Sequence, residues 1–183
     1  GHSNVQGDRT MMIYEKPPAA FLDRVQQVFG FDPPRHEGYD TVAAIEAMID
    51  GRAKVFFGMG GNFAIATPDS EATARGLRRC ALTVNVTTKL NRSHLVHGTD
   101  ALILPCLGRT EIDVQAAGPQ GVTVEDSMSM VHLSSGINPP ASDTLLSEPA
   151  IVAGLAHATL GARSKIDWLG VVQDYDRIRD MIA

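Results

Sequence analysis

Three glycines that follow a short apolar run could bring bare backbone against a phosphate or a sugar. Residues 54–57 read as a strand, and Gly58, Gly60 and Gly61 come directly after it, followed by Asn62. Glycine has no Cβ atom, so it adopts positive φ and lets a ligand approach the backbone amides. Asn62 offers a donor and an acceptor to a ribose or a base edge. Because the spacing is not G-x-G-x-x-G, the pattern alone is also typical of a simple tight turn.

Two more strand-like runs bring polar residues to the same expected edge. Residues 82–86 end in Thr87-Thr88-Lys89, and residues 101–104 end in Pro105. A helix predicted from Thr67-Pro68-Asp69 onward, to about residue 79, lies between the first two runs, and its N-terminus favours phosphate. Strands alternating with helices predict a parallel sheet, which binds ligands beyond the carboxyl ends of its strands. Segments 58–62, 87–91 and 105–109 are therefore expected along one edge.

The fold class predicted from these elements is α/β. We expect a mostly parallel sheet flanked by helices, in a Rossmann-like three-layer arrangement. A short irregular N-terminal segment is also expected, because residues 1–10 are polar and show neither a helical stripe of apolar residues nor a strand-like alternation. Further helices are predicted over residues 19–29, 42–49, 91–97, 149–160 and 166–182. Thr41 is the expected cap of the second of these. Residues 112–114 and 122–124 alternate as two half-exposed strands or a ribbon, with which residues 127–133 are expected to pair.

The composition is that of a globular protein and excludes several classes of partner. The chain has 183 residues, 44% of them apolar and 20% charged, which suits one domain with a substantial core. A net charge of −5 and an aromatic content of 5% give neither a basic footprint nor stacking platforms for nucleic acid. We find no apolar stretch of membrane-spanning length and no signal peptide, so a cytoplasmic location is expected.

Several side chains suggest other chemistry, but each has a simpler interpretation. Cys80 and Cys106 are flanked by apolar residues and are predicted to be buried, and two cysteines are too few for an iron-sulfur cluster held by four. His94 and His97 are spaced for a metal on a helix, yet a capping or solvated role is favoured without further ligands. Ser127 and Ser129 lie near Asp126 and His132 in the sequence, but no G-x-S-x-G elbow supports a catalytic triad.

Four motifs, in the same order, resemble the molybdopterin oxidoreductases, and the most similar branch is the formate-dehydrogenase-like alpha subunits. They are residues 1–7, 57–63, 87–94 and 102–111. The resemblance implies a parent chain several times longer, in which a bis(molybdopterin guanine dinucleotide) cofactor holds molybdenum or tungsten. This sequence resembles the third domain of such a chain. Residues 17–183 would form a Rossmann-like domain that binds molybdopterin guanine dinucleotide, and residues 1–16 the tail of a preceding cofactor-binding domain.

The resemblance also implies roles for individual residues. His2, Asn4 and Gln6 match a loop that approaches a pterin close to the metal. The loop made of Gly58, Met59, Gly60, Gly61 and Asn62 matches one that cradles the phosphates and sugar of a guanine dinucleotide, with Thr67 and Asp69 nearby. Thr87, Thr88 and Lys89 match the segment that reads the nucleotide, although formate dehydrogenases have an acidic residue at the position of Thr87. Lys89 and Arg92 would neutralise phosphates.

Other parts of that family have no counterpart in this sequence. Neither cysteine lies in a motif that matches the family's metal ligand, and the iron-sulfur segment is missing, so the chain is not expected to be catalytic alone. Its expected partners are the remaining domains of the parent polypeptide and the small-molecule cofactor. Two alternatives stay open: a free-standing α/β nucleotide-binding module, and a small enzyme acting on a phosphorylated ligand at the same edge.

Overall fold

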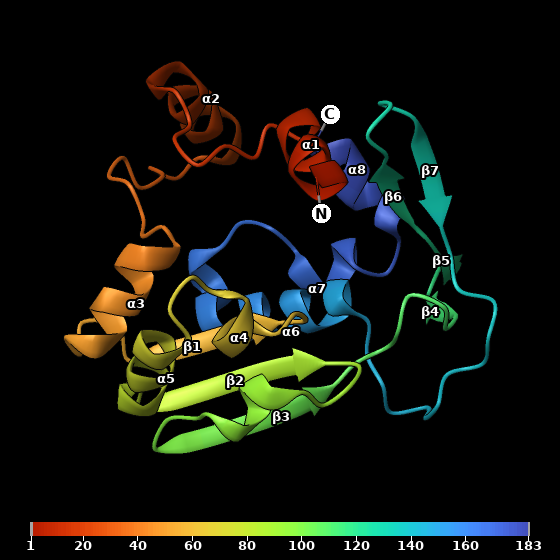
Figure 1. Ribbon diagram of the computed structural model, residues 1–183. Coiled ribbons are helices and arrows are strands. Elements are labelled where there is room, and N and C mark those ends of the chain that lie inside the picture. Colours follow the sequence, from red (N-terminus) through yellow and green to blue (C-terminus); the bar gives the residue numbers. More distant parts are fainter. Residues whose placement is uncertain (1, 183) are drawn as a thin grey trace. The chain divides into compact units, whose positions relative to one another are not determined.

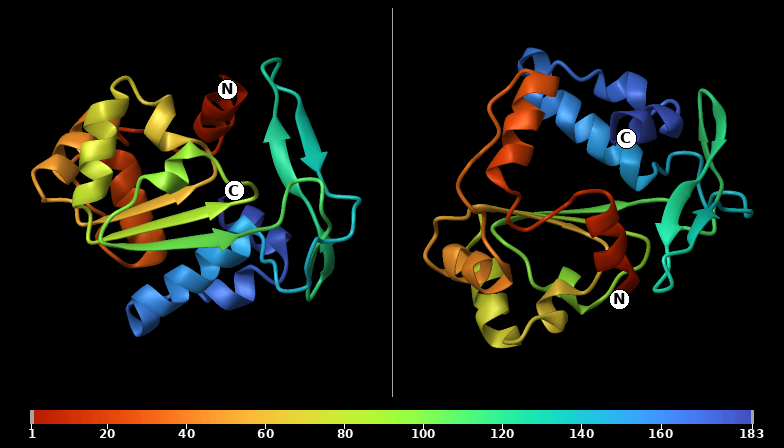
Figure 2. Two further views of the ribbon diagram at one scale, coloured as in Figure 1. Left: turned by 60° about the horizontal axis from the view of Figure 1, so that its bottom comes forward. Right: turned by 90° about the horizontal axis from the view of Figure 1, so that it is seen from above.

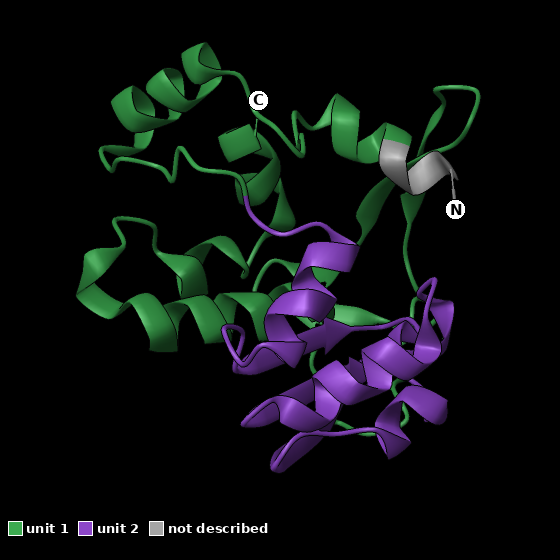
Figure 3. Cartoon of the chain, turned by 60° about the vertical axis from the view of Figure 1, so that its left-hand side comes forward, with its two compact units in different colours: residues 1–37, 108–183 green, residues 38–107 purple. Residues whose placement is uncertain are grey.

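The chain forms two compact units. The computed structural model describes the backbone of residues 2–182 and the side chains of residues 6–182. Unit 1 consists of residues 1–37 and 108–183, and unit 2 of residues 38–107 (Figure 3). The predicted class, α/β with a parallel sheet flanked by helices, is confirmed. The predicted division between residues 16 and 17 stays a prediction. Among the described residues, no helix is both long enough and apolar enough to span a membrane.

Unit 2 is built on a parallel sheet of three strands in the order β1-β2-β3 (Figure 1). The strands are β1 (Val55–Met59), β2 (Leu82–Thr87) and β3 (Asp100–Pro105). The helical elements are α3 (Thr41–Ile49), α4 (Phe63–Ala66), α5 (Ser70–Arg79) and the 3₁₀ helix η1 (Arg92–Leu95). Gly58 stands opposite Asn85, which stands opposite Ile103. The three carboxyl ends therefore meet at one edge, as the sequence predicts.

The core of unit 2 lies between β1 and the helices α3, α4 and α5, which Figure 2 shows on one side of the sheet. Met48, Leu77 and Cys80 are almost completely buried there. Helices α3 and α5 pack closely because Gly76 has no side chain: a Cβ atom at this position would lie 3.1 Å from Cβ of Met48. Cys106 is buried as well, so the predicted burial of both cysteines is confirmed.

Aspartates cap α3 and α5, where the sequence suggested other residues. Asp40, and not Thr41, accepts a hydrogen bond from the N–H of Ala43 at 2.8 Å. Asp69 caps α5 through the N–H of Ala72 at 2.9 Å, so this helix begins at Ser70 and not with Pro68. A carboxylate is a strong acceptor for the unpaired amides of a first helical turn.

Unit 1 contains two antiparallel ribbons and the other described helices. β4 (Asp113–Gln115) pairs with β5 (Gly118–Gln120), and β6 (Val122–Glu125) pairs with β7 (Val131–Ser134). The helices are α1 (His2–Thr10), α2 (Ala19–Phe29), α6 (Glu148–Leu160), the 3₁₀ helix η2 (Gly161–Arg163), α7 (Trp168–Val171) and α8 (Tyr175–Ile182). The predicted pairing of residues 127–133 is confirmed for residues 131–133 in β7, whereas residues 127–130 form the turn between β6 and β7. β5 was not predicted, because Gly-Pro-Gln has no alternation.

Two predictions about helices in unit 1 are wrong. The loop expected over residues 1–10 is helical from His2 to Thr10, and irregular backbone follows over residues 11–18. The single helix expected over residues 166–182 is broken into α7 and α8. Asp167 accepts from the N–H of Gly170 and Asp174 from the N–H of Asp176. Each aspartate starts a new helix. Local side-chain bonds of this kind compete with the backbone hydrogen bonds of a continuous helix.

A buried polar cluster joins β4, β5, α6 and α8 within unit 1. Tyr175 is 4% exposed, and its hydroxyl donates to Asp113 and bonds Ser147 at 2.7 Å. Its backbone N–H donates to Gln120 at 2.9 Å. Burial, followed by the bond to Asp113, raises the pKa of Tyr175 above its ordinary value.

Replacing Tyr175 with phenylalanine is expected to lower the free energy of unfolding by about 1–3 kcal/mol, because Asp113 and Ser147 lose their buried partner. The raised pKa stabilises the native state fully below the unfolded value of about 10, and this contribution is lost as the pH rises toward the folded value. Urea unfolding from pH 8 to 11 should therefore show an alkaline decline that Tyr175→Phe reduces. Tyr39→Phe, at an exposed position, is the matched control. An equal decline in both variants would contradict the assignment.

Candidate functional site

The glycines at the carboxyl end of β1 and just after it are of two kinds. Gly60 and Gly61 have φ of 68° and 71°, and no heavy atom lies within 4 Å of the positions that their Cβ atoms would take. This part of the turn is therefore left-handed and open. Gly58 is different, because a Cβ atom there would lie 2.8 Å from the ring of Phe56. Gly58 serves the packing of the sheet, whereas Gly60 and Gly61 leave the backbone accessible.

Two successive amides in this turn are available to a ligand. The N–H of Gly60 donates to the carbonyl of Val86 at 2.8 Å and so extends the strand ladder. The N–H groups of Gly61 and Asn62 donate to no acceptor among the described residues. Consecutive free amides beside left-handed residues form an anion-binding concavity, and a backbone amide needs an acceptor from water or a ligand.

The loop after β2 holds the glycine turn in place. The side-chain amide of Asn91 donates to the backbone carbonyl of Gly61 at 2.7 Å. Ser93 donates to the side chain of Asn62 at 2.7 Å and accepts from the N–H of Ala64 at 2.9 Å. Neither Asn91 nor Ser93 was among the predicted site residues. Asn91 begins the helix predicted over residues 91–97, and asparagine is a typical N-cap residue, which was the available signal. We call residues 58–62 and 87–92 together the glycine edge.

Two basic side chains and one threonine of the glycine edge face solvent. Thr88, Lys89 and Arg92 are exposed, so both cations can meet a phosphate. Thr87 is buried instead, and its hydroxyl donates to the carbonyl of Lys89 at 2.8 Å and accepts from the N–H of the same residue at 3.3 Å. Thr87 therefore shapes the turn after β2, and its hydroxyl is already bonded within the turn.

Two other predicted contacts, Thr67 and Asp69, also have local structural partners. The hydroxyl of Thr67 bonds that of Thr73 at 2.6 Å, and the carboxylate of Asp69 caps α5. Met59 is half-buried at the end of β1. The roles of these three residues in cofactor binding stay predictions.

The histidine interpretation that favoured capping is confirmed. Nδ1 of His94 accepts from the N–H of Asn91 at 2.8 Å and completes the capping box of η1. His97 bonds the carbonyl of Gly98 through Nδ1 at 2.7 Å. Within the described part of the chain, no group of three histidine, cysteine or acidic side chains is placed to hold a metal ion.

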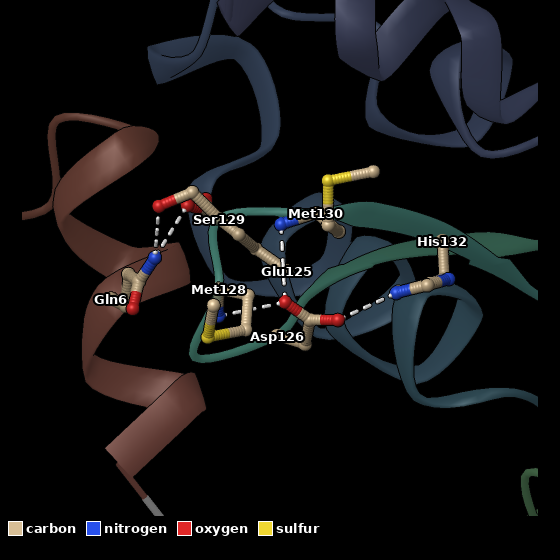
Figure 4. Close-up of polar contacts among 7 residues, drawn as sticks. All are labelled: Gln6, Glu125, Asp126, Met128, Ser129, Met130 and His132. Atoms are coloured by element: carbon tan, nitrogen blue, oxygen red, sulfur yellow. Dashed lines mark hydrogen bonds and ion pairs between the residues drawn. The ribbon is translucent and has the colours of Figure 1, made fainter.

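The predicted contacts near the N-terminus lie in unit 1, whereas the glycine edge lies in unit 2. The side chains of His2 and Asn4 lie outside the described residues. The amide of Gln6 donates to Glu125 at 2.9 Å and to Ser129 at 2.8 Å, so α1 is attached to the β6–β7 hairpin (Figure 4). Its predicted contact with a pterin stays a prediction.

The residues considered for a catalytic triad form a turn instead (Figure 4). The carboxylate of Asp126 accepts from Nε2 of His132 at 2.8 Å and from the N–H groups of Met128 and Met130. His132 first, and then these amides, hold the pKa of Asp126 below its usual range. Ser129 bonds Gln6, and no bond joins His132 to either serine among the described residues. The arrangement closes a hairpin and does not activate a nucleophile.

Known proteins similar to this chain are much longer than it is. Uncharacterized oxidoreductases of Mycobacterium bovis and Mycobacterium tuberculosis are each 60% identical over 183 residues, and the protein YdeP of Escherichia coli strain K12 is 53% identical over 182 residues. All of this chain is covered in each case, but only 24% of the relative. The chain thus spans about a quarter of the length of these relatives. No protein-family model matches it.

Proposed function

We propose that this chain is one domain of a larger oxidoreductase and that its glycine edge binds the nucleotide part of a molybdopterin guanine dinucleotide. The name and length of the mycobacterial relatives support the first part. A sequence that occupies 24% of each relative favours a domain over a free-standing module. The open turn supports the second part, the binding of a nucleotide. Gly60 and Gly61 are left-handed, and the amides of Gly61 and Asn62 have no acceptor among the described residues.

The residues of the glycine edge fit a diphosphate joined to a nucleoside. The two free amides would donate hydrogen bonds to the first phosphate, and Lys89 and Arg92 supply positive charge nearby in the sequence. The side-chain NH₂ of Asn62 has no described acceptor, since only the oxygen of this amide is bonded. It can therefore donate to a ribose or base. Thr87 would orient the turn and not read the guanine.

The role proposed for this chain is to bind and orient the cofactor. When bound, the cofactor supplies a molybdenum or tungsten centre that exchanges electrons with a substrate. The other domains of the parent polypeptide would provide the metal ligand and the rest of the cofactor site. On this proposal the isolated chain binds nucleotide but does not turn over substrate.

Lys89→Ala is expected to weaken the binding of guanosine diphosphate by about tenfold, since a lost charge-assisted bond is worth about 1.5–3 kcal/mol. Isothermal titration calorimetry on the full chain measures this effect. Lys54→Ala is the matched control, because Lys54 is also exposed but precedes β1 at the amino end of the sheet.

Guanosine serves as a second ligand, because it has no phosphate. Its affinity should be unchanged by Lys89→Ala if the lysine contacts phosphate. Failure of the unmodified chain to bind guanosine diphosphate would refute the proposed site, and an equal effect of both lysine variants would refute the role of Lys89.

A further inference from the structure

A second candidate binding site lies in unit 1, lined by the β6–β7 hairpin, the segment before β4 and the segment after β7. It is a pocket of about 430 Å³, within the range of small-molecule sites. Its lining includes Arg109, Leu133, Ser134, Ser135, Ile137 and Asn138. Because the pocket belongs to unit 1 and the glycine edge to unit 2, the inference does not rest on the function proposed above.

Four polar side chains of this pocket, Arg109, Ser134, Ser135 and Asn138, are hydrogen-bond donors with few partners. The guanidinium of Arg109 makes one long bond, 3.5 Å to the hydroxyl of Ser134. Among residues 6–182, no carboxylate forms an ion pair with it. The hydroxyl of Ser135 and the side-chain amide of Asn138 have no described partner. A guanidinium, two hydroxyls and an amide together suit a ligand with several acceptor oxygens.

Two carboxylates are already bonded to other groups: Glu111, which is close to Arg109 in the sequence, and Asp126, which bonds His132. Both carboxylate oxygens of Glu111 accept backbone amides, from Gly108 and Ala141, each at 2.6 Å. Asp126 is bonded to His132 and to two amides. These bonds leave the positive charge of Arg109 available for a ligand.

The apolar part of the lining is exposed. Leu133 is 67% exposed and Ile137 is 83% exposed. We propose that this pocket binds a phosphate group, either free or as the ester of a ligand whose apolar body covers Leu133 and Ile137. The several donors suit the three or four oxygens of a phosphate better than the two of a carboxylate. The apolar side chains favour the ester.

Phenyl phosphate and inorganic phosphate are the probes, each titrated into the full chain and followed by two-dimensional NMR. Phenyl phosphate is expected to bind more tightly, and Arg109→Gln should weaken both ligands by about tenfold or more. Arg78→Gln removes an exposed arginine of α5 and should change neither affinity. Arg109→Lys should restore part of the binding, since it keeps the charge but loses the fork of donors.

A second variant separates the two sources of phosphate. Ile137→Ser should weaken phenyl phosphate and leave inorganic phosphate unchanged if the ligand is an ester. Equal affinity for both probes, dependent on Arg109, would identify free phosphate as the ligand. If neither probe shifts the resonances of residues 109–110 and 132–138, or if Arg109→Gln binds like the unmodified chain while its thermal unfolding is unaltered, the proposal is wrong.

Discussion

Replacing Gly60 and Gly61 together with valine is expected to abolish the binding of guanosine diphosphate. Both residues have φ near 70°, a conformation that a β-branched side chain rarely adopts. The strain should cost about 1–3 kcal/mol at each position, and the turn can relieve it only by moving. Such a movement would redirect the free amides of Gly61 and Asn62, which the proposed site requires. Calorimetric titration and thermal unfolding of the same sample measure both effects.

The control for this pair is Gly154→Val in α6. Gly154 also has no heavy atom within 4 Å of its Cβ position, but it lies in a helix with ordinary φ. Valine has a slightly higher helix propensity than glycine, so stability should change by less than about 1 kcal/mol. Binding should be unaltered. A folded double variant that retains the affinity of the unmodified chain would show that nucleotide does not bind at the glycine edge.

The ends of the parallel strands were predictable because local sequence patterns mark them. Apolar runs of five or six residues, interrupted by glycine or threonine, mark β1 and β2, and helical spacing marks α2 and α6. The capping residues were predicted less well. Asp40 and Asp69 were available in the sequence, yet neighbouring threonine and proline gave equally good local signals.

The connection between the two loops of the glycine edge could not be predicted from local patterns. Asn91 and Gly61 are 30 positions apart, and only the parallel pairing of β1 with β2 brings them together. Sequence spacing likewise could not reveal that Gln6 bonds Glu125 of the hairpin, 119 positions away. A polar residue near a strand end serves the backbone as readily as a ligand, and the sequence does not distinguish the two roles.

Gly98→Ala is expected to destabilise unit 2 by about 3 kcal/mol, near the upper end of the usual range for overpacking. A Cβ atom on this buried residue would lie well inside contact distance of the carbonyl oxygen of Cys80 and 3.0 Å from its carbonyl carbon. The same oxygen accepts from the N–H of Thr99 at 3.0 Å, and the N–H of Gly98 donates to Thr83 at 3.2 Å. These contacts join the end of α5 to β2 and to the start of β3, so relief would displace an edge strand.

Gly38→Ala, in the same unit, isolates the effect of that close approach. Gly38 has no neighbour within 4 Å of its Cβ position and does not have positive φ, so alanine should change stability by less than about 0.5 kcal/mol. Amide hydrogen exchange in β2 reports the stability of unit 2 directly. Exchange should accelerate in Gly98→Ala and stay unchanged in Gly38→Ala. Equal protection in both variants would mean that the Cys80 carbonyl can move away at little cost, and the close packing at Gly98 would not determine the position of β3.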